Sequence, residues 1–318
     1  MKIVVIGGTG HIGTYLIPHL VEAGHEVTNI SRGQRQPYRL HSAWRQVQSV
    51  MIDREAADKA GTFGDQIREL RPDVVIDNKC YTVDSARNLV EALRGQMHHL
   101  IICGTIWVHG HSVSVPTTEE QPRRPFGDYG VNKNAVEAYL MDQVRRHGFP
   151  ATVLHPGHIV GPGWQPVNPA GNLNPVVFEK LARGEDLALP NFGMETVHHV
   201  HAADVAQAFW KAIDNWSSAV GQSFHVTSST ALTLRGYAEV VATWFGQEPH
   251  LSFMPFELWR ASVSEEDAER TWDHIAHSPN CSIAKAQRLL DYQPRYTSLQ
   301  AVFESVDWLV KEGVIKTQ

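Results

Sequence analysis

The glycine-rich turn near the start of the chain constrains the fold more than any other feature. Lys2–Ile6 is a short apolar run typical of a buried strand, and His11–Glu22 has the spacing of an amphipathic helix. Gly7-x-x-Gly10-x-x-Gly13 fills the junction between them. Glycines at this spacing permit a tight turn and let backbone N–H groups approach a pyrophosphate at the helix N-terminus. The segment therefore predicts a dinucleotide site rather than a plain turn.

The chain continues this alternation of strands and helices. Further strands are expected at Glu26–Ile30, Val47–Ile52, Pro72–Asp77, His98–Cys103 and Ala151–Gly157, with helices at Phe63–Arg71, Val83–Arg94 and from about Tyr129. This rhythm predicts an α/β fold with a Rossmann-type doubly wound parallel sheet.

Because 318 residues exceed what one hydrophobic core comfortably supports, we expect two parts. The first is a dinucleotide-binding domain (1–156 and 198–228), and the second is a smaller mixed α/β substrate-binding lobe (157–197 and 229–318). Residues 162–175 are rich in Gly, Pro and Asn, which predicts a long and functional loop.

Charge and cysteine content exclude several classes of protein. A net charge of -6 argues against nonspecific binding to nucleic acid or to anionic membranes. No apolar run approaches the roughly 20 residues of a membrane helix, and the glycines follow the start too soon for a signal peptide. Cys80, Cys103 and Cys281 form neither an even disulfide set nor a metal motif. We expect reduced thiols in a cytoplasmic protein.

The end of the second strand bears on the choice between NAD and NADP. A carboxylate there would accept hydrogen bonds from the ribose 2′-hydroxyl, but the chain has Ser31 followed by Arg32 and Arg35. We therefore expect NADP rather than NAD, although both arginines could simply be solvated. Asp53, after the third strand, could reach the adenine edge or cap a helix.

Tyr129 and Lys133 are four residues apart where a helix is expected to begin, so their side chains share one face. Tyrosine, with an ordinary pKa of about 10, is a poor acid-base catalyst at neutral pH unless a neighbour lowers that value. A nearby ammonium is one such neighbour.

With these motifs in place, the chain resembles the extended short-chain dehydrogenase/reductase superfamily, also called the NAD-dependent epimerase/dehydratase family. The resemblance runs nearly end to end. It also includes 117–133, "HPGHIVGPG" (His155–Gly163), "HHVHAADVAQAF" (His198–Phe209), and "SIAKAQRLLDYQP" with "SVDWL" near the C-terminus.

The resemblance implies a catalytic set of Thr105, Tyr129 and Lys133. Tyr129 would exchange the proton at the substrate oxygen, Thr105 would hold that oxygen, and Lys133 would lower the tyrosine pKa and bind the nicotinamide ribose. Thr105 could otherwise merely cap a strand. The residues expected to contact the dinucleotide are Gly7, Thr9, Gly10, His11, Ile12, Gly13, Ser31, Arg32, Asp53, Asn78, Tyr129, Lys133, Pro156 and His158.

The chain also departs from the family. Ile106 and Trp107 stand where dehydratases carry an acidic pair, which argues against dehydration. His155 and His158 replace the usual arginine and asparagine, so a nucleotide-diphosphate substrate is not favoured. The expected substrate-binding residues are Trp107, His109, His158, Trp164 and Asn172, with His111 nearby.

This neutral, aromatic set suits a free sugar, a glycoside or a small aromatic ketone, although both tryptophans could serve packing. His199 and His201 share one face of a short strand, but no metal is expected because no further ligand completes a set. His198 and His199 could instead be solvated.

Three functions stay open. The first is a reversible oxidoreductase for a secondary alcohol or ketone of a small, hydroxylated, sugar-like molecule. The second is a sugar or nucleotide-sugar epimerase with tightly held NAD. The third, of a different class, is a non-catalytic RNA-binding or regulatory relative. The resemblance further suggests a homodimer formed through the helices at 83–94 and 133–146, where Leu89, Val136 and Leu140 have helical spacing.

Overall fold

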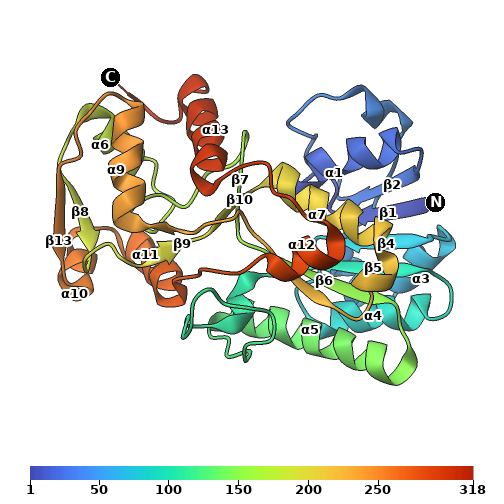
Figure 1. Cartoon of the computed structure of the whole chain (residues 1–318). Helices are drawn as coiled ribbons and strands as arrows, with labels where there is room; N and C mark the ends of the chain where they lie inside the picture. Colours follow the sequence, from blue (N-terminus) through green and yellow to red (C-terminus); the bar gives the residue numbers. More distant parts are fainter. Residues whose placement is uncertain (318) are drawn as a thin grey trace.

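The computed structural model describes residues 1–317 and is built on one parallel sheet (Figure 1). Seven strands lie in the order β11-β6-β5-β4-β1-β2-β3. Every neighbouring pair is parallel. The strands are β1 (Lys2–Ile6), β2 (Glu26–Ser31), β3 (Gln48–Met51), β4 (Val74–Asp77), β5 (His99–Cys103), β6 (Ala151–Pro156) and β11 (Ser223–Val226). The predicted α/β fold with a doubly wound sheet is confirmed.

Helices cover both faces of this sheet because its strands are apolar on both sides. Along β1, Ile3 and Val5 pack into the core under one set of helices, and Val4 and Ile6 pack under the other. One face carries α1 (His11–Glu22), α7 (Ala202–Asp214) and α12 (Ala284–Leu290). The opposite face carries α2 (Arg54–Lys59), α3 (Phe63–Glu69), α4 (Val83–Leu93) and α5 (Gly127–His147).

A smaller mixed region forms the second core, on the left in Figure 1. Its helices are α6 (Val176–Arg183), α9 (Leu234–Trp244), α10 (Phe256–Trp259), α11 (Glu265–His277) and α13 (Ser298–Lys311). Its strands pair as β8 (Leu187–Pro190) with β13 (Leu251–Met254) and β9 (Thr196–Val197) with β12 (Leu232–Thr233). We call it the C-terminal lobe.

Short elements connect the two cores. β7 (His158–Val160) leaves the main sheet directly after β6 and pairs in parallel with β10 (His199–His201). The remaining short helices are η1 (Ser42–Gln46), η2 (Ile106–His109), α8 (Trp216–Ala219) and η3 (Arg260–Ser262). Residues 162–175 contain no helix or strand, as predicted.

The apolar residues proposed for a dimer face lie elsewhere. Leu89, Val136 and Leu140 are at most 1% exposed and belong to the core between the sheet and helices α4 and α5. Core packing therefore explains their spacing, and they offer no surface to a second copy. Within residues 1–317, no helix is both long enough and apolar enough to cross a membrane.

Candidate active site

A cleft of about 810 Å³ opens at the carboxyl ends of β1 to β4. It brings together six of the predicted dinucleotide contacts: Gly7, Thr9, Gly10, Ser31, Arg32 and Asp53. Strand order reverses beside β1, and in open α/β sheets ligands bind at such a switch point. Lys79 and Tyr81, which the sequence did not suggest, also line this cleft.

The glycine loop is built for close backbone approach. A Cβ on Gly13 would lie 2.0 Å from the carbonyl oxygen of Gly8, so only glycine lets α1 pack against the end of β1. A Cβ on Gly10 would meet only Gly7 O, at 3.2 Å. Gly10 precedes α1, whose first turn has no side-chain cap. Its free N–H groups suit an anionic pyrophosphate.

Two asparagines beside this loop have unpaired polar atoms. Both amide atoms of Asn78 and Oδ1 of Asn29 are shielded from solvent and have no hydrogen-bond partner among residues 1–317. Asn78 directly follows β4, at the rim of the cleft. Buried polar groups are normally paired, so these atoms fit a bound dinucleotide that would pair them.

Charge around the cleft is mixed. Arg32, Arg35 and Lys79 line it, and Ser31 Oγ accepts a hydrogen bond from Gly33 N at 3.3 Å. Asp53 caps α2 by accepting from Ala56 N at 3.1 Å, so its alternative role as a helix cap is the one observed.

Lys133 occupies the position that the Tyr-x-x-x-Lys spacing predicts. Its ammonium is buried and donates to the carbonyl oxygens of Cys80 (2.8 Å) and Cys103 (2.7 Å). It lies 4.6 Å from the ring centre of Tyr81 and 5.8 Å from that of Tyr129. Two carbonyls from the ends of neighbouring strand segments therefore fix this cation beneath both rings.

Tyr129 lies between the cleft and the C-terminal lobe. Its ring is 6.5 Å from that of Tyr81 on one side and 6.0 Å from that of Trp107 on the other. Desolvation raises the pKa of Tyr129 above its ordinary value, with Cys103 and Tyr81 adding to the rise and the Thr105 hydroxyl opposing it. Because the residue is still 45% exposed, the rise is smaller than full burial would produce. The lowering of the Tyr129 pKa that we expected from Lys133 is not seen in the chain alone.

Thr105 caps the N-terminus of η2, where its hydroxyl accepts from the N–H of Trp107 at 3.3 Å, and its backbone is held by a chain of polar groups. Its backbone N–H donates to Nδ1 of His155 (3.0 Å), and Nε2 of His155 lies 3.2 Å from Glu137 on α5. Arg123 completes the chain with two bonds to Glu137, at 2.8 and 3.1 Å. Burial raises the pKa of Glu137, but His155 and Arg123 outweigh it and hold that pKa well below its usual range. Nδ1 of His155 is therefore the acceptor for Thr105, and Nε2 is the nitrogen that faces Glu137.

Replacing His155 with leucine is expected to lower kcat about tenfold with a smaller change in KM. The variant leaves the Thr105 N–H unpaired, which frees the predicted catalytic hydroxyl to move. His99→Leu is the matched control, since His99 is an equally buried imidazole that bonds Thr152 at 2.8 Å within the sheet. The control should lose stability and retain kcat; equal losses of kcat would show that both effects are structural.

Trp107 and His158 meet two histidines that sequence reasoning missed. The Trp107 ring stacks on His277 at 4.2 Å and meets His274 at 5.5 Å and His158 at 6.4 Å. His274 and His277 are on α11, more than a hundred residues away in the chain. The pattern His-x-x-His on a helix could have suggested one shared face, but not its partner.

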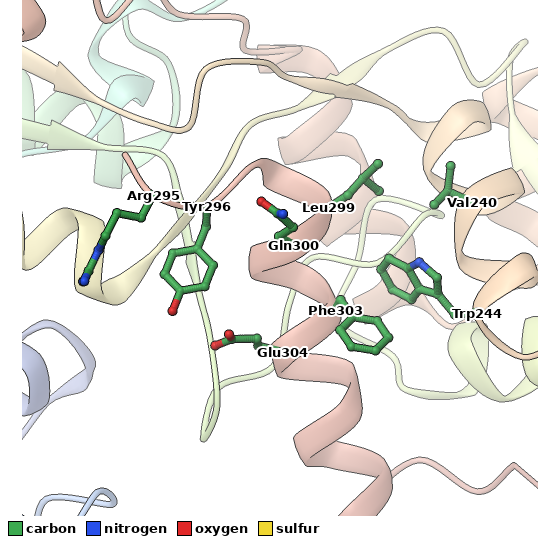
Figure 2. Close-up of a pocket in the computed structure, with 8 residues that line it drawn as sticks. All are labelled: Val240, Trp244, Arg295, Tyr296, Leu299, Gln300, Phe303 and Glu304. Atoms are coloured by element: carbon green, nitrogen blue, oxygen red, sulfur yellow. The ribbon is translucent and has the colours of Figure 1, made fainter. Parts of the chain in front are cut away.

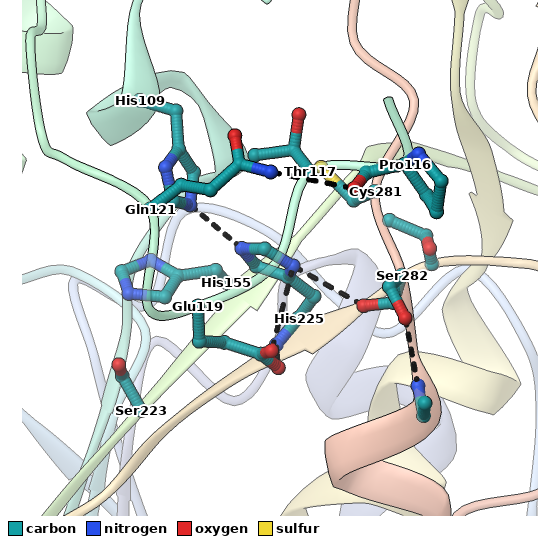
Figure 3. Close-up of polar contacts among 12 residues, drawn as sticks. His109, Pro116, Thr117, Glu119, Gln121, His155, Ser223, His225, Cys281 and Ser282 are labelled. Atoms are coloured by element: carbon teal, nitrogen blue, oxygen red, sulfur yellow. Dashed lines mark hydrogen bonds and ion pairs between the residues drawn. The ribbon is translucent and has the colours of Figure 1, made fainter. Parts of the chain in front are cut away.

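The other predicted pocket residues lie elsewhere. His109 belongs to a separate buried cluster, where its Nε2 contacts Nε2 of His225 at 2.8 Å (Figure 3). Arg123 also lies 3.2 Å from this nitrogen. His111 is exposed and contacts the Ala276 carbonyl at 2.7 Å. The Asn172 amide is engaged by Asn168 (2.6 Å) and Thr271 (3.1 Å), so it holds the long loop together.

Trp164 lies against the dinucleotide side instead of the Trp107 side. Its ring stacks on His11 of the glycine loop at 4.9 Å, and this contact joins the long loop 162–175 to the start of α1. Ile12 packs in the core of the Rossmann sheet. After Pro156, the N–H groups of Gly157 and His158 already donate to Val226 O (3.1 Å) and His198 O (2.8 Å). Those donors are therefore not free for a nicotinamide amide.

His198, which precedes β10, and the β10 histidines His199 and His201 are not solvated. His198 and His199 are fully buried, where their Nε2 atoms contact the carbonyls of Ser228 and Val167, each at 3.0 Å. His201 contacts Glu304 at 3.1 Å. Among residues 1–317, no three His, Cys, Asp or Glu side chains are grouped as metal ligands. The three cysteines are buried free thiols.

A second hollow, of about 430 Å³, lies between α9 and α13 (Figure 2). Trp244 and Phe303 meet edge to face at 5.2 Å on one side, and Tyr296 and Glu304 face the open space on the other. It contains none of the predicted catalytic residues.

A Rossmann sheet with a glycine loop and a cleft at its switch point, with Lys133 beside the Tyr81 ring of that cleft, is the architecture of a nicotinamide-dependent enzyme of the short-chain dehydrogenase/reductase type. The NAD dependent epimerase/dehydratase family matches residues 3–226, and the chain belongs to this family.

Individual relatives agree with this assignment. A UDP-glucose 4-epimerase from Mycolicibacterium smegmatis is 25% identical over 90% of this chain and 96% of its own length. A 2'-dehydrokanamycin reductase from Streptomyces kanamyceticus is 24% identical over 98% of this chain and 86% of its own. The solved structure of a UDP-glucose 4-epimerase from Thermotoga maritima has a TM-score of 0.74 at 20% identity, covering 98% of this chain and 99% of that one.

Proposed function

We propose that the protein is an epimerase-type oxidoreductase that acts at a secondary alcohol of a sugar. The observation that carries the proposal is the place of Tyr129, between Tyr81 of the dinucleotide cleft and Trp107 of the C-terminal side, at 6.5 and 6.0 Å. A substrate carbon between these rings has the hydride partner on one side and a proton carrier within reach. The relatives named as epimerases favour this function over our first expectation of a reductase.

When bound, the nicotinamide supplies reversible hydride exchange at the substrate carbon. Tyr129 takes the proton of the substrate hydroxyl and later returns it. Thr105, fixed through its N–H by His155 at 3.0 Å, offers its hydroxyl to the same oxygen. Lys133 places a fixed positive charge 5.8 Å from the Tyr129 ring, where it favours the tyrosinate once the hydroxyl group is enclosed. Inversion would then require that the ketone formed from the substrate turn its opposite face toward the dinucleotide cleft before its carbon is reduced again.

The finer proposal is a neutral, hydroxylated substrate. The histidines at 155 and 158 provide no permanent cation, whereas a diphosphate is best held by arginine forks. Because a relative is named UDP-glucose 4-epimerase, UDP-linked hexoses belong in the same screen as free sugars and glycosides. Nuclear magnetic resonance of each candidate after incubation tests the proposal directly: one inverted carbon supports it, and no inversion or oxidation of any candidate rejects it.

A reductase that releases NADP(H) is the second candidate. Arg32 and Arg35 line the dinucleotide cleft, and a serine stands where an NAD enzyme would offer a carboxylate. The family name favours NAD, so the preference for NADP is kept only as part of this second candidate. The third alternative, an RNA-binding relative, fits poorly with a net charge of -6 and an assembled Thr–Tyr–Lys set.

Mass spectrometry of the dinucleotide released from freshly denatured protein separates the two candidates. We expect near-stoichiometric NAD that survives dialysis, because an epimerase keeps its cofactor through the cycle. In that case Arg32→Ala should leave the bound NAD unchanged. Little retained cofactor, together with a roughly tenfold loss of NADP affinity in Arg32→Ala, would identify the reductase instead.

A homodimer built on α4 and α5, and a cytoplasmic location, belong to the same proposal. The homodimer follows from the family resemblance. The cytoplasmic location follows from the reduced cysteines. Light scattering after size exclusion measures the oligomeric state, and a monomer at micromolar concentration would contradict the dimer.

A further inference from the structure

Four aromatic rings lie on the side of Tyr129 that faces away from the dinucleotide cleft. We call Trp107, His158, His274 and His277 the histidine wall. Trp107 is its centre, with the His277 ring stacked on it at 4.2 Å and Tyr129 at 6.0 Å. His158 and His274 meet at 5.0 Å. Tyr129 therefore contacts the wall through Trp107 and the dinucleotide cleft through Tyr81.

The hydrogen bonds of these histidines determine where their protons lie. His158 Nδ1 accepts from the backbone N–H of His198 at 3.2 Å, so its neutral ring carries the proton on Nε2. His277 is the opposite case, because its Nδ1 donates to the Asp273 carbonyl at 2.6 Å and its Nε2 keeps a free lone pair. The wall thus offers one N–H donor and one nitrogen acceptor.

Both of these nitrogens are unsatisfied. Nε2 of His158 and Nε2 of His277 are shielded from solvent and have no hydrogen-bond partner in the described chain, residues 1–317. His277 as a whole is only 2% exposed. Buried imidazole nitrogens are usually paired, so a donor and an acceptor left open beside Trp107 indicate a ligand that supplies both. A hydroxyl group donates and accepts at once, and a sugar ring presents several above an apolar face.

The wall also lacks charge. Desolvation, aided by the neighbouring histidines His274, His199, His198 and His277, lowers the pKa of His158 well below its ordinary value. Burial likewise lowers the pKa of His274 and of His277 to about 4. Arg270 is the charged side chain that acts on His274, and it is paired with Glu266 at 3.3 Å. Near neutral pH the wall is uncharged, and a carboxylate placed against it would lose its hydration without gaining a cation.

We propose that the histidine wall is the subsite for an uncharged, hydroxylated sugar ring, and that it selects against rings that bear a carboxylate. This inference rests on the proposed sugar oxidoreductase function for the placement of the reacting carbon. It assigns a role in specificity to His274 and His277.

Binding to NAD-loaded Tyr129→Phe protein tests the inference without requiring turnover. Isothermal titration compares UDP-glucose with UDP-glucuronic acid, and a methyl glucoside with the matching methyl glucuronide, at pH 7.5. We expect the neutral member of at least one pair to bind about tenfold more tightly or better. The preference should shrink toward pH 5, because histidines with a pKa near 4 then protonate more readily to pair with the carboxylate.

His277→Phe is the decisive variant, because it keeps an aromatic ring against Trp107 and removes the acceptor nitrogen. It should weaken the neutral sugar roughly fivefold or more and change the uronate little. His250→Phe is the control, since His250 is an exposed histidine that directly precedes β13 and is not part of the wall. It should change neither ligand.

Three results would overturn the inference: uronates that bind as tightly as neutral sugars, no binding of either pair, or unchanged binding in His277→Phe. Hydride transfer by the wild-type protein is measured separately. Neutral-selective binding without any transfer would reject the proposed function and leave the subsite standing.

Discussion

Tyr129→Phe is expected to lower turnover by about 10²–10⁴-fold, the usual contribution of a positioned proton carrier, and to leave dinucleotide binding nearly intact. The substitution removes one oxygen and keeps the ring that meets Trp107 and Tyr81. Tyr81, rather than Tyr129, lines the dinucleotide cleft. Steady-state rates and a fluorescence titration with NAD measure the two effects. Activity that survives the change would mean that another group carries the proton.

The pH profile gives this variant a second readout. Desolvation raises the pKa of Tyr129 in the chain alone, so the hydroxyl is protonated at neutral pH. Oxidation of an alcohol requires the deprotonated form, and its rate should therefore rise with pH in the wild type. This increase of the oxidation rate with pH should be absent from any residual activity of Tyr129→Phe. Saturation with oxidised NAD should shift the wild-type increase to lower pH, because a bound positive charge favours tyrosinate.

Gly13→Ala is expected to lower the Tm by roughly 5–10 °C or to prevent folding. The added methyl would lie 2.0 Å from the Gly8 carbonyl oxygen and 2.5 Å from its carbonyl carbon. Gly8 is itself closely packed, since a Cβ added to it would lie 2.4 Å from Ile17 and 2.5 Å from Asn29. Its backbone therefore has little room to move away from the new methyl group. Thermal unfolding of the protein stripped of cofactor measures the effect.

Gly10→Ala is the matched control in the same loop. Its methyl would meet only the Gly7 carbonyl oxygen, at 3.2 Å, and its backbone is extended with φ -82°. We expect a Tm within about 2 °C of wild type and an affinity for NAD at least about tenfold weaker, since the methyl occupies the approach to the helix N-terminus. Equal Tm losses in both variants would contradict the distinction between packing and binding.

Local patterns predicted the fold well because each strand of a doubly wound sheet is a short apolar run and each helix is amphipathic. The helix His11–Glu22 has the predicted limits. The helix of the tyrosine begins at Gly127, two residues before the expected start. The sequence of Ser223–Ser229 is also typical of a strand, and the structure has β11 over Ser223–Val226, but its place at the edge of the main sheet depends on pairing with β6.

The site was only partly predictable. Thr105, Tyr129 and Lys133 follow from spacing and resemblance, because Tyr129 and Lys133 share one face of α5 and Thr105 caps η2 directly after β5. Side chains whose roles depend on a distant partner could not be placed. His109 contacts His225, and Trp164 contacts His11, in both cases across segments far apart in sequence. Asn172 contacts Asn168 because the long loop folds back on itself. His274 and His277 were missed by the sequence analysis. They reach Trp107 only because α11 packs over η2.

The stack of His11 on Trp164 has a kinetic consequence. His11 is the first residue of α1, and Trp164 belongs to the long loop 162–175. If the lobes separate to release a dinucleotide, this ring pair, 4.9 Å apart, must come apart first. The residence time of the cofactor would then depend partly on a contact between two side chains that are not part of the lining of the cleft. Two homologues with identical glycine loops could therefore exchange cofactor at very different rates, and the residue at position 164 would distinguish them.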